Sequence, residues 1–295
     1  MPDQGFPPMF YAQLFVNGLF QGLVIGLAAL SITLVFGIAR FPNAATGDSM
    51  TLGAYAALAA HKASGSFIVA GLGAAGATGL VLLLAYWSVF RKLANRSVVA
   101  LLVASIGIAF VLRAALGVAF GHGQQVFQVP LARPYLFGGL RILPLDLQMA
   151  LVALVTLIAV FGLLYLTAIG RQMRAVADNR DLARVSGIRP GRVMIALWLL
   201  AGAVAGIAGM MLGMKTIVTP EFGWEMLLPA FTAAILGGIG SPVGAVVAGL
   251  ILGAMQEVST PFVGFTYKIA IAFVIMLAVL LVRPRGLFGR VEGVR

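Results

Sequence analysis

Long apolar stretches follow one another from the start of this sequence to its end, separated by short polar segments. About 20 mainly apolar residues cross the roughly 30 Å hydrocarbon core of a membrane as a helix, and several stretches exceed that length. Only 10% of the residues are charged and the mean hydropathy is +1.05, which excludes an ordinary soluble domain. The sequence therefore predicts an all-α, polytopic integral membrane helical bundle that forms a single domain over residues 1–295.

The bundle is predicted to have eight or nine spans, some of them short or broken. The apolar stretches lie at 12–39, 48–60, 65–90, 97–120, 147–169, 193–214, 226–240, 243–259 and 265–282. Three of them, 48–60, 226–240 and 243–259, are short enough to be half-helices or re-entrant elements. Nine crossings with the N-terminus outside place every loop on the side of the membrane that its charge predicts. Eight crossings would require one short element to be re-entrant.

Basic residues orient the bundle in the membrane, because arginine and lysine concentrate in cytoplasmic loops. The basic segments are 91–96, 170–192 and the tail with Arg283, Arg285, Arg290 and Arg295. The weakly charged segments 121–146 and 215–225 fit the outer side. The net charge of +11 thus reflects membrane orientation, and no aromatic interleaving indicates nucleic-acid binding. We expect a multi-pass protein of the plasma membrane, the inner membrane of a bacterium.

The basic segment 170–192 contains two predicted amphipathic helices. Met173, Val176 and Ala177 recur at helical spacing, and Asp178 or Asn179 can cap a second helix. That second helix has Leu182 and Val185 on its apolar side and Gly187 as its C-terminal stop. A short helix at the cytoplasmic face can pass a rigid-body movement to the adjoining spans. The alternative is an ordinary arginine-rich loop.

At this segment the sequence resembles the branched-chain amino acid, or Liv-type, family of ABC transporter permeases. Similar stretches are Gln13 to Leu19, Leu52 to Tyr55 and Ile235 to Ala245. One departure is that the chain reads Asn-Ala-Ala-Thr-Gly at 43–47, where the family commonly has Asn-Phe-Ala-His-Gly. In the family the counterpart of 170–192 docks on the ATPase. The resemblance therefore implies ATPase-coupling roles for Arg174, Ala177, Asp178, Ala183, Arg184 and Gly187.

The resemblance also implies partners: a second, related permease subunit, two ATP-binding subunits and an extracytoplasmic substrate-binding protein. The substrates that it implies are leucine, isoleucine or valine, although relatives may carry other amino acids, amides, urea or aromatic acids. The chain itself lacks a phosphate-binding Gly-x-x-x-x-Gly-Lys-Ser/Thr loop, since none of its lysines follows a glycine. We expect ATP and magnesium on partner subunits and no cofactor here.

Two interruptions of the apolar pattern, at 41–48 and 237–244, are candidates for the translocation path. Irregular backbone at membrane depth is tolerated only inside protein or beside water, and broken helices often mark a transporter's path. Asn17 and Gln21 share one face of the first span, where they could line a polar path or bond to a neighbouring helix. The predicted path residues are Asn17, Gln21, Asn43, Thr46, Asp48, Gly238, Gly240 and Ser241. For Asp48, helix capping is the rival explanation.

Arg113 and Glu257 are ionisable residues within predicted spans, and such residues need a partner or water. In the nine-span arrangement both fall in the outer half of the membrane, so we predict that they form an intramembrane charge pair. Structural neutralisation is the favoured role, ahead of gating or substrate contact.

Other classes of function find less support in the sequence. A metal site is not expected, because there is no cysteine and His61 and His122 have no ligand cluster around them. An intramembrane enzyme would need a His-Glu-x-x-His helix or a nucleophile beside a histidine, and neither pattern is present. The stronger alternative to an ABC importer permease is an ion-coupled secondary transporter of small polar solutes, which shares broken helices. A purely structural or assembly role is a further alternative that physical arguments alone do not exclude.

Overall fold

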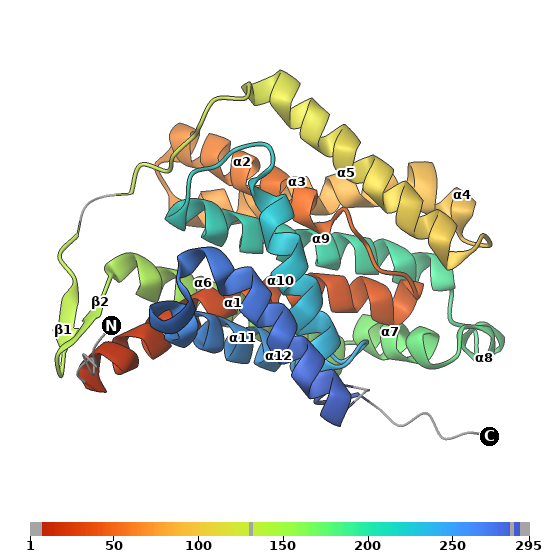
Figure 1. Ribbon diagram of the computed structural model, residues 1–295. Coiled ribbons are helices and arrows are strands. Elements are labelled where there is room, and N and C mark those ends of the chain that lie inside the picture. Colours follow the sequence, from red (N-terminus) through yellow and green to blue (C-terminus); the bar gives the residue numbers. More distant parts are fainter. Residues whose placement is uncertain (1–7, 130–131, 284–285, 290–295) are drawn as a thin grey trace.

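The computed structural model of the protein describes residues 8–129, 132–283 and 286–289. Arg285, Arg290 and Arg295 of the predicted cytoplasmic tail lie outside the described residues. Within them the fold is nearly all-helical, as predicted (Figure 1). Six helical segments are long and apolar enough to cross a membrane: α1 (Pro8–Ala39), the continuous run of α3 (Phe67–Ala85), η1 (Tyr86–Phe90) and α4 (Arg91–Leu93), α5 (Val98–Phe120), α6 (Pro144–Leu166), α9 (Pro190–Lys215) and α11 (Pro242–Val263).

The remaining elements are shorter. They are α2 (Thr46–Ser64), the antiparallel hairpin of β1 (Tyr135–Phe137) and β2 (Leu140–Ile142), α7 (Ala168–Asp178), α8 (Arg180–Val185), α10 (Phe222–Gly237), the 3₁₀ turn η2 (Phe265–Tyr267) and α12 (Lys268–Val282). The count of eight or nine spans is therefore not confirmed. The stretch 243–259 was predicted to be short, which is wrong: α11 continues to Val263 over 22 residues, with Pro261 inside its last turn.

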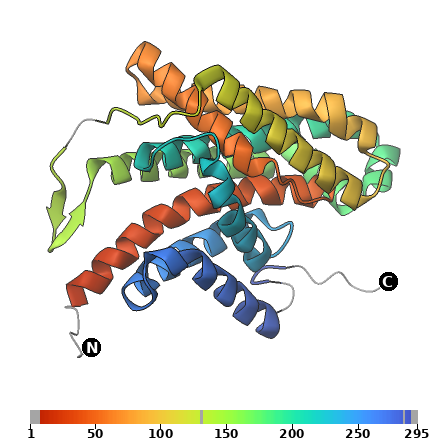
Figure 2. The ribbon, with the colours of Figure 1, turned by 45° about the horizontal axis from the view of Figure 1, so that its top comes forward.

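The loops gather at two opposite ends of the bundle (Figure 1). One end carries α4, α7 and α8, and we call it the α7–α8 end. The other carries the β1–β2 hairpin and the start of α1, and we call it the hairpin end. This separation matches the predicted division into cytoplasmic loops and the outer loop 121–146. Figure 2 shows the hairpin projecting beyond the helices.

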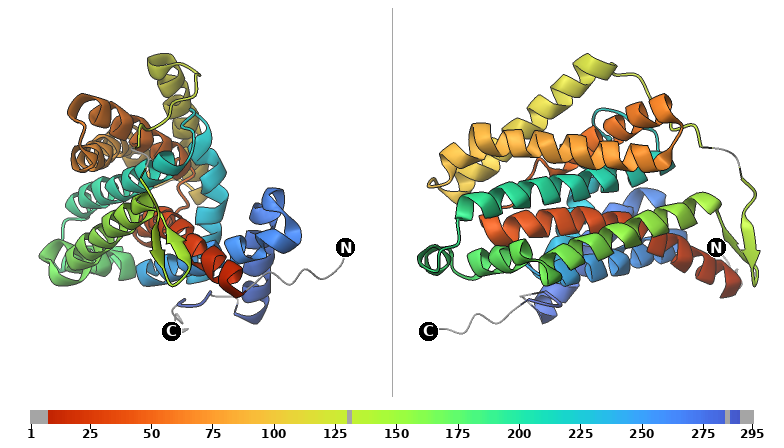
Figure 3. Two further views of the ribbon diagram at one scale, coloured as in Figure 1. Left: turned by 90° about the vertical axis from the view of Figure 1, so that its left-hand side faces the viewer. Right: turned by 180° about the vertical axis from the view of Figure 1, so that it is seen from behind.

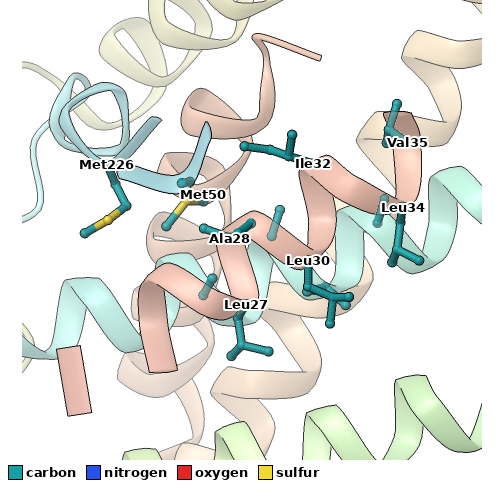
Figure 4. Packing of buried hydrophobic residues seen from close by; sticks show 14 of the residues in the cluster. Leu27, Ala28, Leu30, Ile32, Leu34, Val35, Met50 and Met226 are labelled. Atoms are coloured by element: carbon teal, nitrogen blue, oxygen red, sulfur yellow. The ribbon is translucent and has the colours of Figure 1, made fainter. Parts of the chain in front are cut away.

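Helices α1 and α9 form the centre of the bundle, and α5 and α6 lie at its periphery (Figures 1 and 3). The middle of α1 is fully enclosed, with Val24, Ile25, Leu27 and Leu30 all inaccessible to solvent. Figure 4 shows side chains from α1, α2 and α10 in this core. The outward side chains of α5 and α6 are mainly apolar, as expected of surfaces that face lipid.

Glycines bring the central helices into backbone contact. A Cβ atom on Gly53 of α2 would lie 2.3 Å from the Cα of Gly206 in α9, and one on Gly253 of α11 would lie 2.4 Å from the Cα of Gly22 in α1. Gly202, Gly206 and Gly209 of α9 likewise each face another backbone, so they allow close helix packing. Gly76, by contrast, has open space around it.

Candidate functional site

The first interruption, between α1 and α2, is a non-helical connector inside the protein. Phe41, Asn43 and Ala45 are buried, although they belong to no helix. Phe41 packs at the α7–α8 end, with its ring centroid 5.2 Å from that of Phe90. The first turns of α2 pack against Gly206, in the second half of α9, so α2 begins part-way through the bundle. The prediction of a broken helix is confirmed here.

Local hydrogen bonds satisfy the connector, as buried irregular backbone requires. The N–H of Ala44 donates to Ser105 Oγ of α5 (3.0 Å), and that of Ala45 donates to Asn43 Oδ1 (3.2 Å). Thr46 Oγ1 donates to the Asn43 carbonyl (2.9 Å). The Asn43 Nδ2 group is buried without a partner among the described residues. Asn43 and Thr46 thus shape the start of α2.

Asp48 lies in the first turn of α2 and binds Arg113 of α5. Arg113 Nε donates to Asp48 Oδ1 at 2.9 Å and Nη2 donates to Oδ2 at 3.3 Å, while the Asp48 side chain is fully buried. The guanidinium also lies 5.1 Å from the ring centroid of Trp224. Asp48 therefore neutralises an intramembrane arginine, and α2 has no side-chain cap at its N-terminus.

The predicted pair of Arg113 and Glu257 is wrong. Glu257 Oε1 instead accepts a hydrogen bond from Lys268 Nζ at 2.6 Å, at the junction of α11 and α12. Lys268 lies one short turn after α11, so its flexible side chain reaches Glu257 locally. Arg113 and Glu257 are thereby both paired, but with Asp48 and Lys268 and not with each other.

The second interruption, Gly238–Ser241, joins α10 to α11. Gly238 has φ +98°, and a Cβ there would lie 2.5 Å from the backbone N of Gly289, so a larger residue is excluded. The N–H of Phe288 donates to the Gly237 carbonyl at 3.1 Å, which holds the segment after α12 against this turn. Ser241 Oγ accepts from the Gly244 N–H at 3.2 Å and caps α11.

The two interruptions border one cavity of about 180 Å³. Pro42 of the connector and Ile239 and Gly240 of the second turn reach it, and α1 and α10 form its walls. The full lining is Ile32, Thr33, Phe36, Pro42, Phe231, Ala234, Ile235, Ile239 and Gly240. The structure therefore brings Gly240 together with the connector. The lining does not include the other predicted path residues of the two interruptions, which are Asn43, Thr46, Asp48, Gly238 and Ser241.

The polar pair on α1 lies elsewhere. Asn17 accepts a hydrogen bond from Gln13 Nε2 at 3.0 Å, and Gln13 in turn binds the backbone of Arg141 in the hairpin. Gln21 is half-buried. At 1.5 Å per helical residue, Gln21 is about 18 Å along α1 from Thr33. Asn17 thus lies toward the hairpin end, and Gln21 lies in the middle of α1, apart from the cavity.

The predicted pair of amphipathic helices is confirmed as α7 and α8. Asn179 Oδ1 accepts from the N–H groups of Asp181 and Leu182, both at 3.0 Å, and so caps α8. Gly187 follows α8 with φ +83°, as a glycine stop requires. On α7 the buried side is Met173 and Val176.

The predicted apolar side of α8, Leu182 and Val185, does not pack against the rest of the protein. Ala183 is the buried residue, while Leu182 and Val185 are 64% and 86% exposed. Asp178, Arg184 and Gly187 are exposed beside them. Arg174 points back to the membrane domain, where it donates to the Leu164 carbonyl and stacks on Tyr165. The α7–α8 end therefore presents two apolar side chains within a charged surface.

Arg40, which the sequence analysis did not select, ties α7 to the connector. Its guanidinium donates to the carbonyl of Ala177 at the end of α7. Arg40 also has φ +61°, the one non-glycine residue with positive φ in the described chain. A basic residue beside the break, at the end of an apolar stretch, was the available signal. Lys215 and Asp146, paired at 2.6 Å between α9 and α6, were also missed.

The described residues contain no group of three histidine, cysteine, aspartate or glutamate side chains placed to hold a metal. The imidazole of His61 stacks on Phe67, with centroids 4.4 Å apart. The features of the described residues that could serve a function are the helix breaks, the cavity and the α7–α8 loop.

Comparisons with known proteins agree over nearly the whole chain. A family model described as branched-chain amino acid transport system / permease component matches residues 14–280. The LivH permease protein of Salmonella typhimurium is 30% identical, over 96% of this chain and 97% of its own length. The BraD permease protein of Pseudomonas aeruginosa has the same identity and coverage. A probable LivH of Methanocaldococcus jannaschii is 30% identical over 89% of this chain.

A solved structure, PsaBC from Streptococcus pneumoniae in complex with Fab, has a chain that covers 91% of this one with 16% identity and a TM-score of 0.50. At that identity the likeness shows the fold alone. The family model and the relatives decide the classification, because both extend over most of the sequence. The chain belongs to the permease component family of branched-chain amino acid transport systems.

Proposed function

We propose that this protein is the membrane-spanning permease subunit of an ABC importer and forms half of a translocation path for branched-chain or related amino acids. Its named relatives are branched-chain amino acid permease proteins, which supports that substrate class over the alternative of an ion-coupled transporter. Its location would be the bacterial inner membrane, with α7 and α8 in the cytoplasm and nine crossings in which α2, α10 and α12 are the short ones.

The observation that carries the proposal is the exposed apolar pair on α8. Leu182 and Val185 are exposed to solvent on α8, at the end of the molecule that carries the basic loops. Two adjacent exposed aliphatic side chains with Asp178 and Arg184 beside them suit an interface with an apolar centre and a polar rim. An ATP-binding subunit is the partner that an importer of this family requires there.

A mechanical route leads from that surface to the connector. α7 is anchored to the membrane domain through Met173 and Val176, and the Ala177 carbonyl near its end accepts a hydrogen bond from Arg40. Movement of α7 by ATP-driven closure of the partner subunits would pull on the α1–α2 connector and hence on one side of the cavity. Alternation between outward-open and inward-open states follows from that movement. No covalent chemistry takes place on this chain.

The complete importer would contain two permease subunits, this chain and a related one, two ATP-binding subunits with ATP and magnesium, and an extracytoplasmic binding protein. In that assembly Asn17 and Gln21 would face the outer entrance. Asn43, Thr46 and Asp48 would support the path from behind, and Gly238, Gly240 and Ser241 would form its inner turn.

The test compares two leucine-to-aspartate variants with similar exposure. Leu182→Asp on α8 should abolish co-purification of an ATP-binding subunit and ATP-dependent leucine uptake, because a charge there prevents apolar docking. Leu136→Asp in the hairpin, 71% exposed at the opposite end, should leave both intact. Uptake by the isolated chain without ATP would reject the proposal in favour of the ion-coupled transporter.

A further inference from the structure

The β1–β2 hairpin exposes apolar side chains on both of its faces. Tyr135, Leu136 and Phe137 follow one another along β1, so neighbours point to opposite faces, and all three are more than half exposed. A two-stranded hairpin by itself is marginally stable in water at best. Its base is held by Gln13 of α1, which donates to the Arg141 carbonyl and accepts from the Arg141 N–H, both at 2.8 Å. The described residues leave the apolar strand itself uncovered.

The hairpin lies at the level where two spans enter the membrane. Helix α6 begins at Pro144, two residues after β2 ends. Gln13, which holds the hairpin from the other side, lies at the start of the apolar stretch 12–39. Figures 1 and 3 show the hairpin lying across the direction of α1 and α6, at their ends. Because both helices enter hydrocarbon where their apolar stretches begin, the hairpin is at the boundary between hydrocarbon and lipid headgroups.

The exposed apolar surface continues from the hairpin onto α6. Leu143, Leu147 and Leu151 are spaced by four residues, so they share one side of the helix, and all three are exposed. This side faces outward at the periphery of the bundle, where α6 is in contact with lipid. Leu143 follows the last residue of β2 directly. The lipid that covers α6 therefore reaches the hairpin without a break.

The charges around the hairpin suit the phosphate groups of lipids. Arg133 precedes β1 and Arg141 lies in β2, both are exposed, and neither guanidinium forms an ion pair with a described residue. The segment 121–145 contains no aspartate or glutamate that would repel a phosphate. An arginine binds phosphate through charge-assisted hydrogen bonds, and tyrosine is enriched where membrane meets water. The hairpin thus combines apolar and aromatic side chains with two unpaired arginine charges.

We propose that the β1–β2 hairpin is a lipid anchor. Its apolar strand, with Tyr135, Leu136 and Phe137, lies among the lipids at the membrane boundary, and Arg133 and Arg141 bind lipid phosphates. Amphipathic surface elements enter this boundary region by about 5–10 Å. Because Gln13 is bonded to the hairpin, the anchor also fixes the height of the start of α1 in the membrane. The leaflet concerned is the outer one in the orientation proposed above.

Spin labels can locate the hairpin directly. The chain has no cysteine, so Leu136→Cys and Phe137→Cys each provide a single labelling site, one on each face. The labelled complex is reconstituted without its binding protein in vesicles of phosphatidylethanolamine and phosphatidylglycerol. Collisions of the label with oxygen, which concentrates in hydrocarbon, are compared with collisions with a nickel complex, which stays in water. Ile158→Cys, on the exposed side of α6, gives the value for lipid, and exposed Gln124→Cys gives the value for water.

We expect the oxygen-to-nickel ratio of at least one hairpin label to be several-fold above that of Gln124→Cys and to approach that of Ile158→Cys. The arginines are tested on the label that reports lipid. Arg133→Gln/Arg141→Gln should move it toward water, because each basic residue beside an anionic membrane is worth about fivefold in binding. Arg133→Lys/Arg141→Lys keeps both charges and should keep the label in lipid. An unchanged label in the glutamine variant would reject the phosphate contacts.

The water value of Gln124→Cys at both Leu136→Cys and Phe137→Cys would overturn the anchor. If those labels then left water when the purified extracytoplasmic binding protein was added, the partner of the hairpin would be a protein instead of lipid. Neither readout involves import or ATP. Failure of the anchor therefore leaves the proposed function standing, and a complex that does not import leucine leaves the anchor standing.

Discussion

Arg113 of α5 donates two hydrogen bonds, of 2.9 and 3.3 Å, to the buried carboxylate of Asp48 in α2. This pair joins a peripheral helix to the interior at the point where α2 begins. Because Asp48 is fully buried, the loss of its partner would leave an uncompensated charge inside the protein.

Arg113→Met should therefore destabilise the protein by about 3–5 kcal/mol. Removal of both charges in Arg113→Met/Asp48→Asn should recover much of that loss, since no charge then stays unpaired. Unfolding in mixed detergent micelles measures the difference. As a control, Lys268→Met breaks the more exposed pair with Glu257 and should cost about 0–1 kcal/mol.

A charge reversal tests which partner Arg113 has. Arg113→Glu should be rescued in part by Asp48→Arg and not by Glu257→Arg, because only Asp48 lies within hydrogen-bonding distance. Recovery of folded protein with Glu257→Arg instead would contradict the observed pairing.

Arg40→Gly should uncouple ATP hydrolysis from import. Glycine tolerates the positive φ of this position, so the variant removes the contact with Ala177 at little cost in backbone strain. We expect an assembled complex with normal stability and about tenfold lower import per ATP hydrolysed, as a hydrogen bond from a charged donor is worth roughly 1.5–3 kcal/mol. Arg96→Ala, at an exposed residue of the same end, is the control. Normal coupling in Arg40→Gly would show that the contact transmits nothing.

Two glycine-to-alanine substitutions should have opposite effects. Gly53→Ala forces α2 and α9 apart, because its Cβ would lie 2.3 Å from the Gly206 Cα, and should destabilise by about 1–3 kcal/mol or more. Gly76→Ala meets nothing within 4 Å and should stabilise α3 by up to about 1 kcal/mol. Thermal unfolding of both variants in one detergent provides the comparison, and equal shifts would contradict the close contact.

Local signals in the sequence were enough to predict the α7–α8 loop. The Asn179 cap and the Gly187 stop depend on backbone geometry within a few residues, and both are observed. Periodicity also separated Leu182 and Val185 from their polar neighbours. The spacing did not show whether that side packs inward. A helix side that binds another subunit has the same pattern of apolar residues as a side buried within its own chain.

The sequence did not indicate which residues far apart in the chain pair with each other. Arg113 was recognised as needing a carboxylate, but the choice between Asp48 and Glu257 depends on where α2 begins inside the bundle. That position follows from the buried connector and from the contact of Gly53 with Gly206, which hydropathy does not encode. The cavity was missed for the same reason, because Thr33 and Ala234 meet only when α1 and α10 pack together.

The contact of Gly22 with Gly253 also sets an order for assembly during synthesis. Helix α1 leaves the ribosome first, yet its closest backbone neighbour, α11, is among the last helices made. The Ala44 amide likewise has no acceptor until Ser105 of α5 has been synthesised. A nascent chain that stops before α11 thus holds its first helix without the partner that locates it. The N-terminal span can settle in its final place only when translation is almost complete, whereas the connector behind it can form its bond to Ser105 as soon as α5 is made.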